Sequence, residues 1–308
     1  MNYKTMLILL SVLLSISMIV LSINKFNATY ELIRVRAATT TSLYVTGLLD
    51  YLADKFRERY NCNIILAFMP LGSGEALRRA ENGDVCLVLV HAPSLEKEYI
   101  YKGVLTDGHI FAYNYFIIVG PKDDPANVSH SSSVIEAFRK IYLAGELGKV
   151  KFISRGDKSG TNIRELMIWG LTGLNPKGKP WYIETGSGMG KTLLVANEFN
   201  AYTLSDIGTF LKFKSEGRIP NLVILYSNDT ELINIYSAYI VSTCSGIEKS
   251  IASDFIKFLI SDAQELIAKY GIQEYGKPLF YPAKSRIEWL SKIWSMLANG
   301  QRWVLRLE

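Results

Sequence analysis

Apolar and polar positions alternate along the chain with two periods, and the alternation predicts layered α/β structure. Short, almost continuously apolar runs are typical of buried strands, and they cover residues 32–40, 63–69, 86–92, 150–154, 181–185 and 201–204. Windows with one apolar helical face separate them and predict helices over residues 47–59, 75–82, 94–102, 132–144, 161–171, 189–200 and 206–214, with helices also dominating residues 248–270. Strand followed by helix, repeated in this way, indicates an α/β fold class.

Two longer extended runs interrupt this alternation, at residues 109–120 and 222–242. We expect them to carry the chain from one α/β block to a second block and back again. The sequence therefore predicts a two-lobed fold with a ligand cleft and a hinge between the lobes. Residues 31–112 and 233–308 would form the first lobe, and residues 113–232 the second.

An uncharged apolar run extends from Thr5 to Asn24. As a helix it would span about 30 Å, enough to cross a bilayer. Residues 1–30 are therefore predicted to be a signal anchor, or a signal peptide if they are cleaved, with the rest of the chain outside the cytoplasmic membrane. The opposite orientation stays open, because Lys4 and Lys25 flank the run symmetrically. The run is the only one of its length, which excludes a polytopic membrane protein.

The composition of the chain excludes several classes of protein and several kinds of site. A chain of 308 residues with 49% hydrophobic and 20% charged residues is globular rather than disordered or fibrous. Its net charge of +5 includes no long basic run, so nucleic acid is not an expected partner. Its 3 cysteines allow at most one disulfide, and we expect Cys62 and Cys86 to be buried as small apolar side chains. The 3 histidines show no zinc-ligand spacing, and no metal cation site is predicted.

The strand-to-helix junctions repeat one chemistry. Each offers hydroxyl groups, glycines that allow close backbone approach and the unpaired N–H groups of a helix N-terminus, and the junctions lie at residues 39–42, 72–74, 154–161 and 184–192. One such junction alone is usually a turn or a helix cap. All of them follow strands, however, and ligands of α/β sheets bind beyond the carboxyl ends of strands. Arg155 is the only arginine among them and can donate paired hydrogen bonds to an oxyanion.

Enzymatic signatures are weak. The stretch GSGMGKT imitates an ATP-binding loop, but Thr185 stands where that motif requires its first glycine. No G-x-S-x-G sequence is present, and the histidines available as bases are His91, His109 and His130. His91 is expected to be a hydrogen-bonded structural residue. We therefore predict a protein that is not an enzyme, with an extracytoplasmic hydrolase as the least favoured alternative.

Several longer segments of the chain carry a further signal: TTTS, LGSGEALRRAENGDVCLVLVHAP, YNYFIIVGPKDDPA, FISRGDKSGTNIRE and WYIETGSGMGKTLLVANEFNAYTLSDIGTF. Taken together, these segments resemble a known family, the tungstate-binding solute receptors of ABC importers. The resemblance extends over about residues 36–280. It implies a type II periplasmic-binding-protein fold, a monomer without a cofactor, and tungstate or molybdate as the oxyanion ligand. It also implies a membrane permease with a cytoplasmic ATPase as partner.

The family's binding positions, together with the fourth junction, give the predicted oxyanion site: Thr40, Thr41, Ser42, Ser73, Gly74, Arg155, Ser159, Gly160, Thr161, Ser187 and Gly188. Glu75 departs from the family pattern and would lie near a dianion. As a residue of the first helical turn it can point away from the ligand, and Lys158 and Lys191 are expected to offset its charge.

The chemistry of the ligand limits the choice further. A fully deprotonated tetrahedral oxyanion accepts hydrogen bonds only, whereas a protonated phosphate also needs an acceptor in its site. The junctions supply mainly donors, which favours tungstate, and Asp157 is the ambiguous member because an inward carboxylate would favour phosphate. Molybdate, phosphate and sulfate remain alternative ligands. A membrane-tethered oxyanion sensor remains an alternative function.

Overall fold

The computed structural model describes residues 2–3, 15, 32–60, 63–227 and 229–300, and its large compact unit begins at Arg34. The predicted signal segment therefore lies outside the described residues except at positions 2, 3 and 15, and Cys62 lies outside them as well. Of the helices in the described part of the chain, none has the length and apolarity needed to cross a membrane.

Strands form at nearly all the apolar runs of the sequence. They are β1 (Ile33–Thr40), β2 (Ile64–Leu71), β3 (Leu87–Val90), β4 (Leu105–Pro121), β5 (Phe152–Ser154), β6 (Tyr182–Glu184), β7 (Thr203–Asp206), β8 (Leu222–Tyr226), β9 (Ile233–Val241) and β10 (Tyr281–Pro282).

Helices separate most of these strands. They are α2 (Thr41–Val45), α3 (Leu48–Tyr60), α4 (Ser73–Glu81), α5 (Pro93–Tyr101), α6 (Val134–Glu146), α7 (Gly160–Thr172), α8 (Met189–Glu198), α9 (Ile207–Ser215), α10 (Gly246–Ile260), α11 (Ala263–Lys269), α12 (Ile272–Tyr275) and α13 (Ile287–Ala298). Short 3-10 turns lie at Val128–His130, Thr230–Leu232 and Lys284–Arg286.

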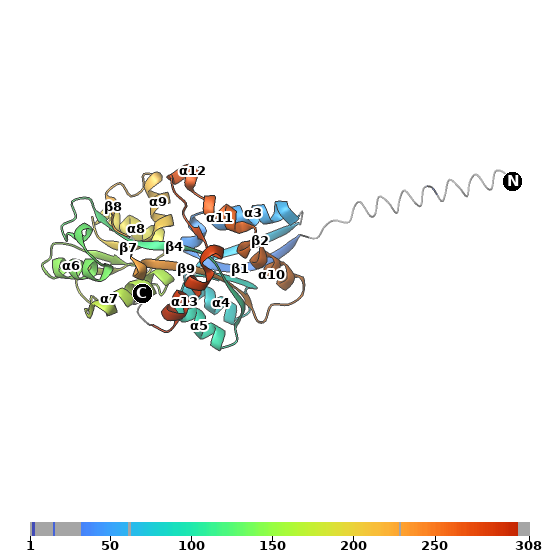
Figure 1. Ribbon diagram of the computed structural model, residues 1–308, viewed down its shortest axis with the longest axis horizontal. Helices are drawn as coiled ribbons and strands as arrows, with labels where there is room; N and C mark the ends of the chain where they lie inside the picture. The colour runs from blue at the N-terminus through green and yellow to red at the C-terminus, as the bar shows by residue number, and fades with distance from the viewer. Residues whose placement is uncertain (1, 4–14, 16–31, 61–62, 228, 301–308) are drawn as a thin grey trace. The chain divides into compact units, whose positions relative to one another are not determined.

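The long strand β4 joins two groups of strands. Along the main sheet the order is β10-β4-β9-β3-β1-β2, with β1 parallel to β3 and β9 antiparallel to both β3 and β4. The far end of β4 pairs with β7 and β8, next to the parallel pair β5 and β6. Figure 1 shows β4 and β9 crossing the middle of the compact unit, between the helices α6 to α9 and the helices α3 to α5.

Each group of strands has its own apolar core. In the first group, Leu77 and Val88 belong to a core that α4 and β3 share, while Leu290 of α13 belongs to another. In the second group, Phe138, Phe152 and Trp169 pack together. The two-lobed α/β architecture expected from the sequence is therefore confirmed, although the lobe boundaries at residues 112/113 and 232/233 stay predictions.

Two predicted elements are divided in the structure. The extended run 222–242 becomes β8, a 3-10 turn and β9, because the side chain of Asp229 accepts the backbone N–H of Glu231 and caps the turn. The helix predicted from Gly47 is preceded by the short helix α2, which starts directly after β1. Gly47 has a φ of +81° and separates α2 from α3.

Cys86 corrects an expectation. It is buried, as predicted, but it forms a disulfide with Cys244 rather than remaining a free thiol. Cys86 precedes β3 and Cys244 follows β9, and these strands are antiparallel neighbours that pair Leu87 with Ile240. The strand ends thus bring together cysteines that are 158 residues apart in sequence, a separation at which spacing predicts nothing.

The tryptophans of the last helix contribute to the core. Trp289 and Trp294 lie on α13 and pack against the cluster that includes buried Tyr113, Leu290 and Ile293. Trp303 lies outside the described residues.

Candidate functional site

Two junctions of the first lobe place hydroxyl groups at helix N-termini. Thr40 ends β1 and caps α2, since its Oγ1 accepts the N–H of Leu43 at 3.4 Å. After β2, Gly72 occupies the cap position of α4, so Ser73 and Gly74 form that helix's first turn. The first N–H groups of a helix have no partner within it, so both junctions expose backbone donors.

Two junctions of the second lobe do the same and add charge. Arg155 follows β5, and Ser159 caps α7 by accepting the N–H of Asn162 at 3.3 Å. Gly188 caps α8 after β6, and the preceding Ser187 donates its backbone N–H to the carbonyl of Arg155 at 3.3 Å. The two junctions of this lobe are therefore bonded to each other.

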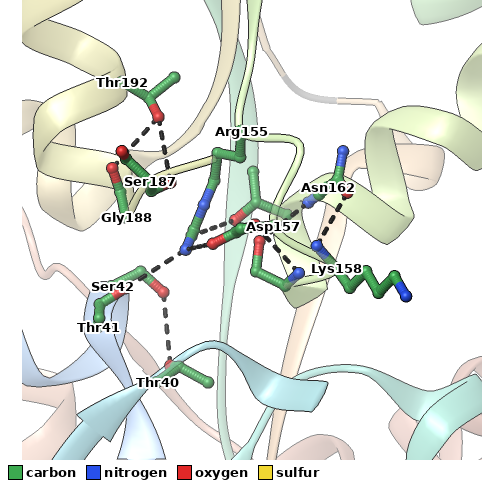
Figure 2. A network of polar contacts seen from close by, with 12 residues as sticks. Thr40, Thr41, Ser42, Arg155, Asp157, Lys158, Asn162, Ser187, Gly188 and Thr192 are labelled. Atoms are coloured by element: carbon green, nitrogen blue, oxygen red, sulfur yellow. Dashed lines mark hydrogen bonds and ion pairs between the residues drawn. The ribbon is translucent and has the colours of Figure 1, made fainter. Parts of the chain in front are cut away.

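The junctions of the two lobes contact each other. The Arg155 guanidinium donates from Nη2 to Thr41 Oγ1 at 3.4 Å, and a Cβ on Gly188 would lie 3.3 Å from the same oxygen. A Cβ on Gly72 would lie 3.6 Å from the carbonyl oxygen of Asp157, and one on Gly74 would lie 3.5 Å from that of Lys158. The structure thus brings all four predicted junctions together. Figure 2 shows Arg155 between the first junction and the two junctions of the second lobe.

The guanidinium of Arg155 is almost fully buried and only partly bonded. Its Nη2 donates to Asp157 Oδ2 at 2.6 Å, and its Nη1 lies 3.5 Å from Thr161 Oγ1. Within the described residues, its Nε and the Oγ of Ser73 are buried atoms without any hydrogen-bond partner. A buried donor without a partner costs about 1 to 3 kcal/mol, so two of them at one site indicate a ligand that accepts hydrogen bonds.

The two acids nearest to the predicted oxyanion site in the sequence, Asp157 and Glu75, are paired with groups of the protein itself. Asp157 accepts the Arg155 guanidinium with one oxygen and the backbone N–H of Ser159, at 3.1 Å, with the other. Glu75 forms ion pairs with Arg78 and Arg79 of its own helix. The expectation that Lys158 and Lys191 offset Glu75 is therefore wrong, because helical spacing supplies nearer cations.

A carboxylic acid lies behind the second lobe's junctions. Glu165 of α7 is buried and accepts hydrogen bonds from Ser154, Trp169 and Tyr182 at 2.7, 3.1 and 2.6 Å. Burial outweighs these bonds and raises the pKa of Glu165 from 4.5 to about 7. Ser154 also accepts from Asn162 Nδ2 at 3.3 Å, which ties this acid to the first turn of α7.

Known proteins are similar to this chain in sequence and in fold. The family model of the PBP superfamily domain matches residues 28–263 of this chain. A Haloferax volcanii protein named as an ABC transporter anion-binding protein is 40% identical over 80% of this chain and 70% of its own. The tungstate-binding protein TupA of Peptoclostridium acidaminophilum is 37% identical over 80% of this chain and 84% of its own.

The chain belongs to the PBP superfamily. Within it, the chain belongs to the same family as the tungstate-binding protein TupA of Peptoclostridium acidaminophilum. The crystal structure titled as the tungstate ABC transporter from Geobacter sulfurreducens has 37% identity and a TM-score of 0.68, over 77% of this chain and 98% of that one. The family resemblance noted in the sequence is therefore confirmed.

In this PBP-superfamily protein, His91 has the structural role expected of it and further contacts that the sequence did not predict. The side chain is buried. Its Nε2 atom lies 3.3 Å from Ser42 Oγ, and its Nδ1 atom lies 2.7 Å from Asn234 Oδ1. A Cβ on Gly160 of the second lobe would lie 2.5 Å from the His91 carbonyl oxygen. Burial lowers the pKa of His91 from 6.5 to about 3, so the ring is neutral.

Sequence reasoning missed Asn114 and Asn234, which form a buried hydrogen bond between β4 and β9 at 2.9 Å. A signal for them does exist. Both are amide side chains within long apolar runs, where a buried polar residue needs a partner.

Proposed function

We propose that this protein is the extracytoplasmic substrate-binding protein of an ABC transporter and that it captures tungstate between its two lobes. The observation that carries the proposal is the pair of buried, unpartnered donors, Arg155 Nε and Ser73 Oγ. They stand on different lobes, at junctions that contact each other. An anion bonded to both would favour the closed arrangement, because a ligand shifts a conformational equilibrium by its differential affinity.

The donor set favours a fully deprotonated tetrahedral anion. Thr41 accepts the Arg155 guanidinium with its oxygen, so its own hydrogen is free to donate, as is that of Ser73. The inward acid, Asp157, already receives a donor on each oxygen. A protonated phosphate would have to compete for these oxygens, whereas tungstate, molybdate or sulfate would need no acceptor. The names of the relatives favour tungstate among these.

We assign the predicted residues to this role as follows. Arg155, Thr41 and Ser73 donate from side chains, and Gly74, Gly160, Thr161 and Gly188 donate backbone N–H groups from the first turns or caps of α4, α7 and α8. Ser159 and Ser187 hold the loops in place through the hydrogen bonds described above. No catalytic group is part of the proposal, and we assign the protein binding alone.

The proposed location is the outer face of the cytoplasmic membrane. The Cys86–Cys244 disulfide supports it, because disulfides persist in oxidising compartments. We propose that the apolar segment within residues 1–30 tethers a monomer near its permease, which a cytoplasmic ATPase drives. The strand order β2-β1-β3-β9-β4, with β9 antiparallel, supports the type II arrangement.

Deleting residues 1–30 tests the tether. We expect the shortened protein to bind the oxyanion with unchanged affinity and to move from the membrane fraction to the soluble fraction. Retention of the shortened protein on membranes would contradict the tether.

Isothermal titration calorimetry tests the ligand. We expect tungstate to bind the purified full-length chain tightly at one site. Molybdate should bind with an affinity equal to or lower than that of tungstate, and sulfate and phosphate should bind weakly. Tight phosphate binding without any tungstate signal would contradict the proposal.

A further inference from the structure

A chain of buried polar side chains leads from the first junction into the strands that connect the lobes. Ser42 Oγ lies 3.3 Å from His91 Nε2, and His91 Nδ1 lies 2.7 Å from Asn234 Oδ1. Asn234 Nδ2 donates to Asn114 Oδ1 at 2.9 Å, and Asn114 Nδ2 donates to the backbone carbonyl of Leu279 at 3.4 Å. All four side chains are buried.

The far end of this chain fixes the direction of its hydrogen bonds. The carbonyl oxygen of Leu279 can only accept, so Asn114 turns its NH₂ group towards it and its oxygen towards Asn234. Asn234 must then present its NH₂ group to Asn114, which leaves its oxygen facing the ring of His91. The Nδ1 atom of His91 therefore carries the ring hydrogen.

The near end follows from the neutrality of the ring. A neutral imidazole with hydrogen on Nδ1 has only a lone pair on Nε2. The partner of that lone pair is Ser42, whose hydroxyl hydrogen then points at His91. In the 3.4 Å contact between Thr40 Oγ1 and Ser42 Oγ, the hydrogen therefore comes from Thr40. The ring itself is held by stacking on Tyr236, with centroids 5.1 Å apart, so it has little freedom to turn away.

We infer that His91 is a positioning residue that turns the Ser42 hydroxyl hydrogen away from the bound oxyanion, so that Ser42 donates no hydrogen bond to it. The inference deepens the proposed function and rests on it for the anion. Two hydroxyls that adjoin in sequence thus have opposite roles. Thr41 accepts a hydrogen bond from the Arg155 guanidinium, so its own hydroxyl hydrogen can be donated to the ligand. Ser42 instead donates to His91 and so holds the first junction in place.

The tautomer of His91 is measured without any ligand. The sequence contains 3 histidines, and the exposed or half-exposed His109 and His130 can be replaced by glutamine, which leaves His91 as the only one. Long-range ¹H–¹⁵N correlation spectra of this full-length chain should show hydrogen on Nδ1 alone between about pH 5 and pH 8. Hydrogen on Nε2, or a protonated ring in this range, would overturn the inference.

Paired variants measure the consequence for binding. We expect Thr41→Val to weaken tungstate binding several-fold more than Ser42→Ala does, while Ser42→Ala lowers the melting temperature because it leaves Nε2 of His91 buried and unpaired. An affinity loss in Ser42→Ala as large as that in Thr41→Val would overturn the inference. If the unaltered chain bound no tungstate, the proposed function alone would fail, because the tautomer is read in the absence of anion.

Discussion

The two lobes contribute different chemistry to the same site. The second lobe brings the charged groups, Arg155 and its partner Asp157, and the titratable acid Glu165 is buried behind them. The first lobe brings neutral groups, the hydroxyls of Thr41 and Ser73 and the uncharged ring of His91. The difference suggests a division of labour in which one lobe attracts the anion and the other completes its hydrogen bonds on closure.

Removing the charged group should have the largest effect. We expect Arg155→Ala to weaken tungstate binding about ten- to a hundredfold, since a charge-assisted hydrogen bond contributes roughly 1.5 to 3 kcal/mol. Calorimetry measures the loss, and Arg57→Ala, at an exposed ion pair of α3, is the matched control. Unchanged affinity in Arg155→Ala would contradict the claim that the charged group of the second lobe attracts the anion.

Blocking the contact between the lobes should have the next largest effect. In Gly160→Ala the new Cβ would lie 2.5 Å from the backbone oxygen of His91, so the lobes must stay further apart. We expect about a tenfold loss of tungstate affinity, which corresponds to roughly 1.4 kcal/mol of strain in the closed form.

A residue of the same helix provides the control. In Gly170→Ala the Cβ would meet nothing within 4 Å, so affinity should be unchanged. Small-angle scattering should show that Gly160→Ala remains extended in the presence of tungstate. If this variant compacted as the unaltered chain does, the contact would not limit closure.

Removing a neutral donor should cost less. Ser73→Ala should weaken binding about two- to tenfold, because a neutral hydrogen bond contributes roughly 0.5 to 1.5 kcal/mol. Its melting temperature without ligand should not fall, since the Ser73 hydroxyl has no partner within the described structure. A loss as large as that of Arg155→Ala would show that the first lobe is not the weaker contributor.

The smallest effect on ligand binding is expected at the buried acid Glu165, whose protonation changes the stability of the fold with pH. The pKa of Glu165 is raised to about 7, so between about pH 4.5 and pH 7 the folded state holds a proton that the unfolded state has released. Its contribution to stability is therefore lost as the pH rises through this window, by up to about 1.4 kcal/mol per unit. Glu165→Gln should flatten this part of the stability curve in denaturant titrations. Identical slopes in both proteins would show that the buried acid does not titrate there.

The sequence was sufficient to predict the junctions because each one is local. A strand, a glycine or hydroxyl and a helix start can be recognised within ten residues, as at Ser73 or at Ser159. The contacts that make them one site, the hydrogen bond from Arg155 to Thr41 and the approach of Gly160 to His91, are not local. Like the Cys86–Cys244 disulfide and the Asn114–Asn234 bond, they depend on strand order, which residue spacing does not encode.

A crystal of the full-length chain grown with tungstate, measured at the tungsten absorption edge, tests the central claim most directly. The account predicts a single anomalous peak within hydrogen-bonding distance of Arg155 Nε and Ser73 Oγ, with the lobes in contact as they are here. A tungsten peak elsewhere on the protein, or none in the presence of saturating tungstate, would contradict it.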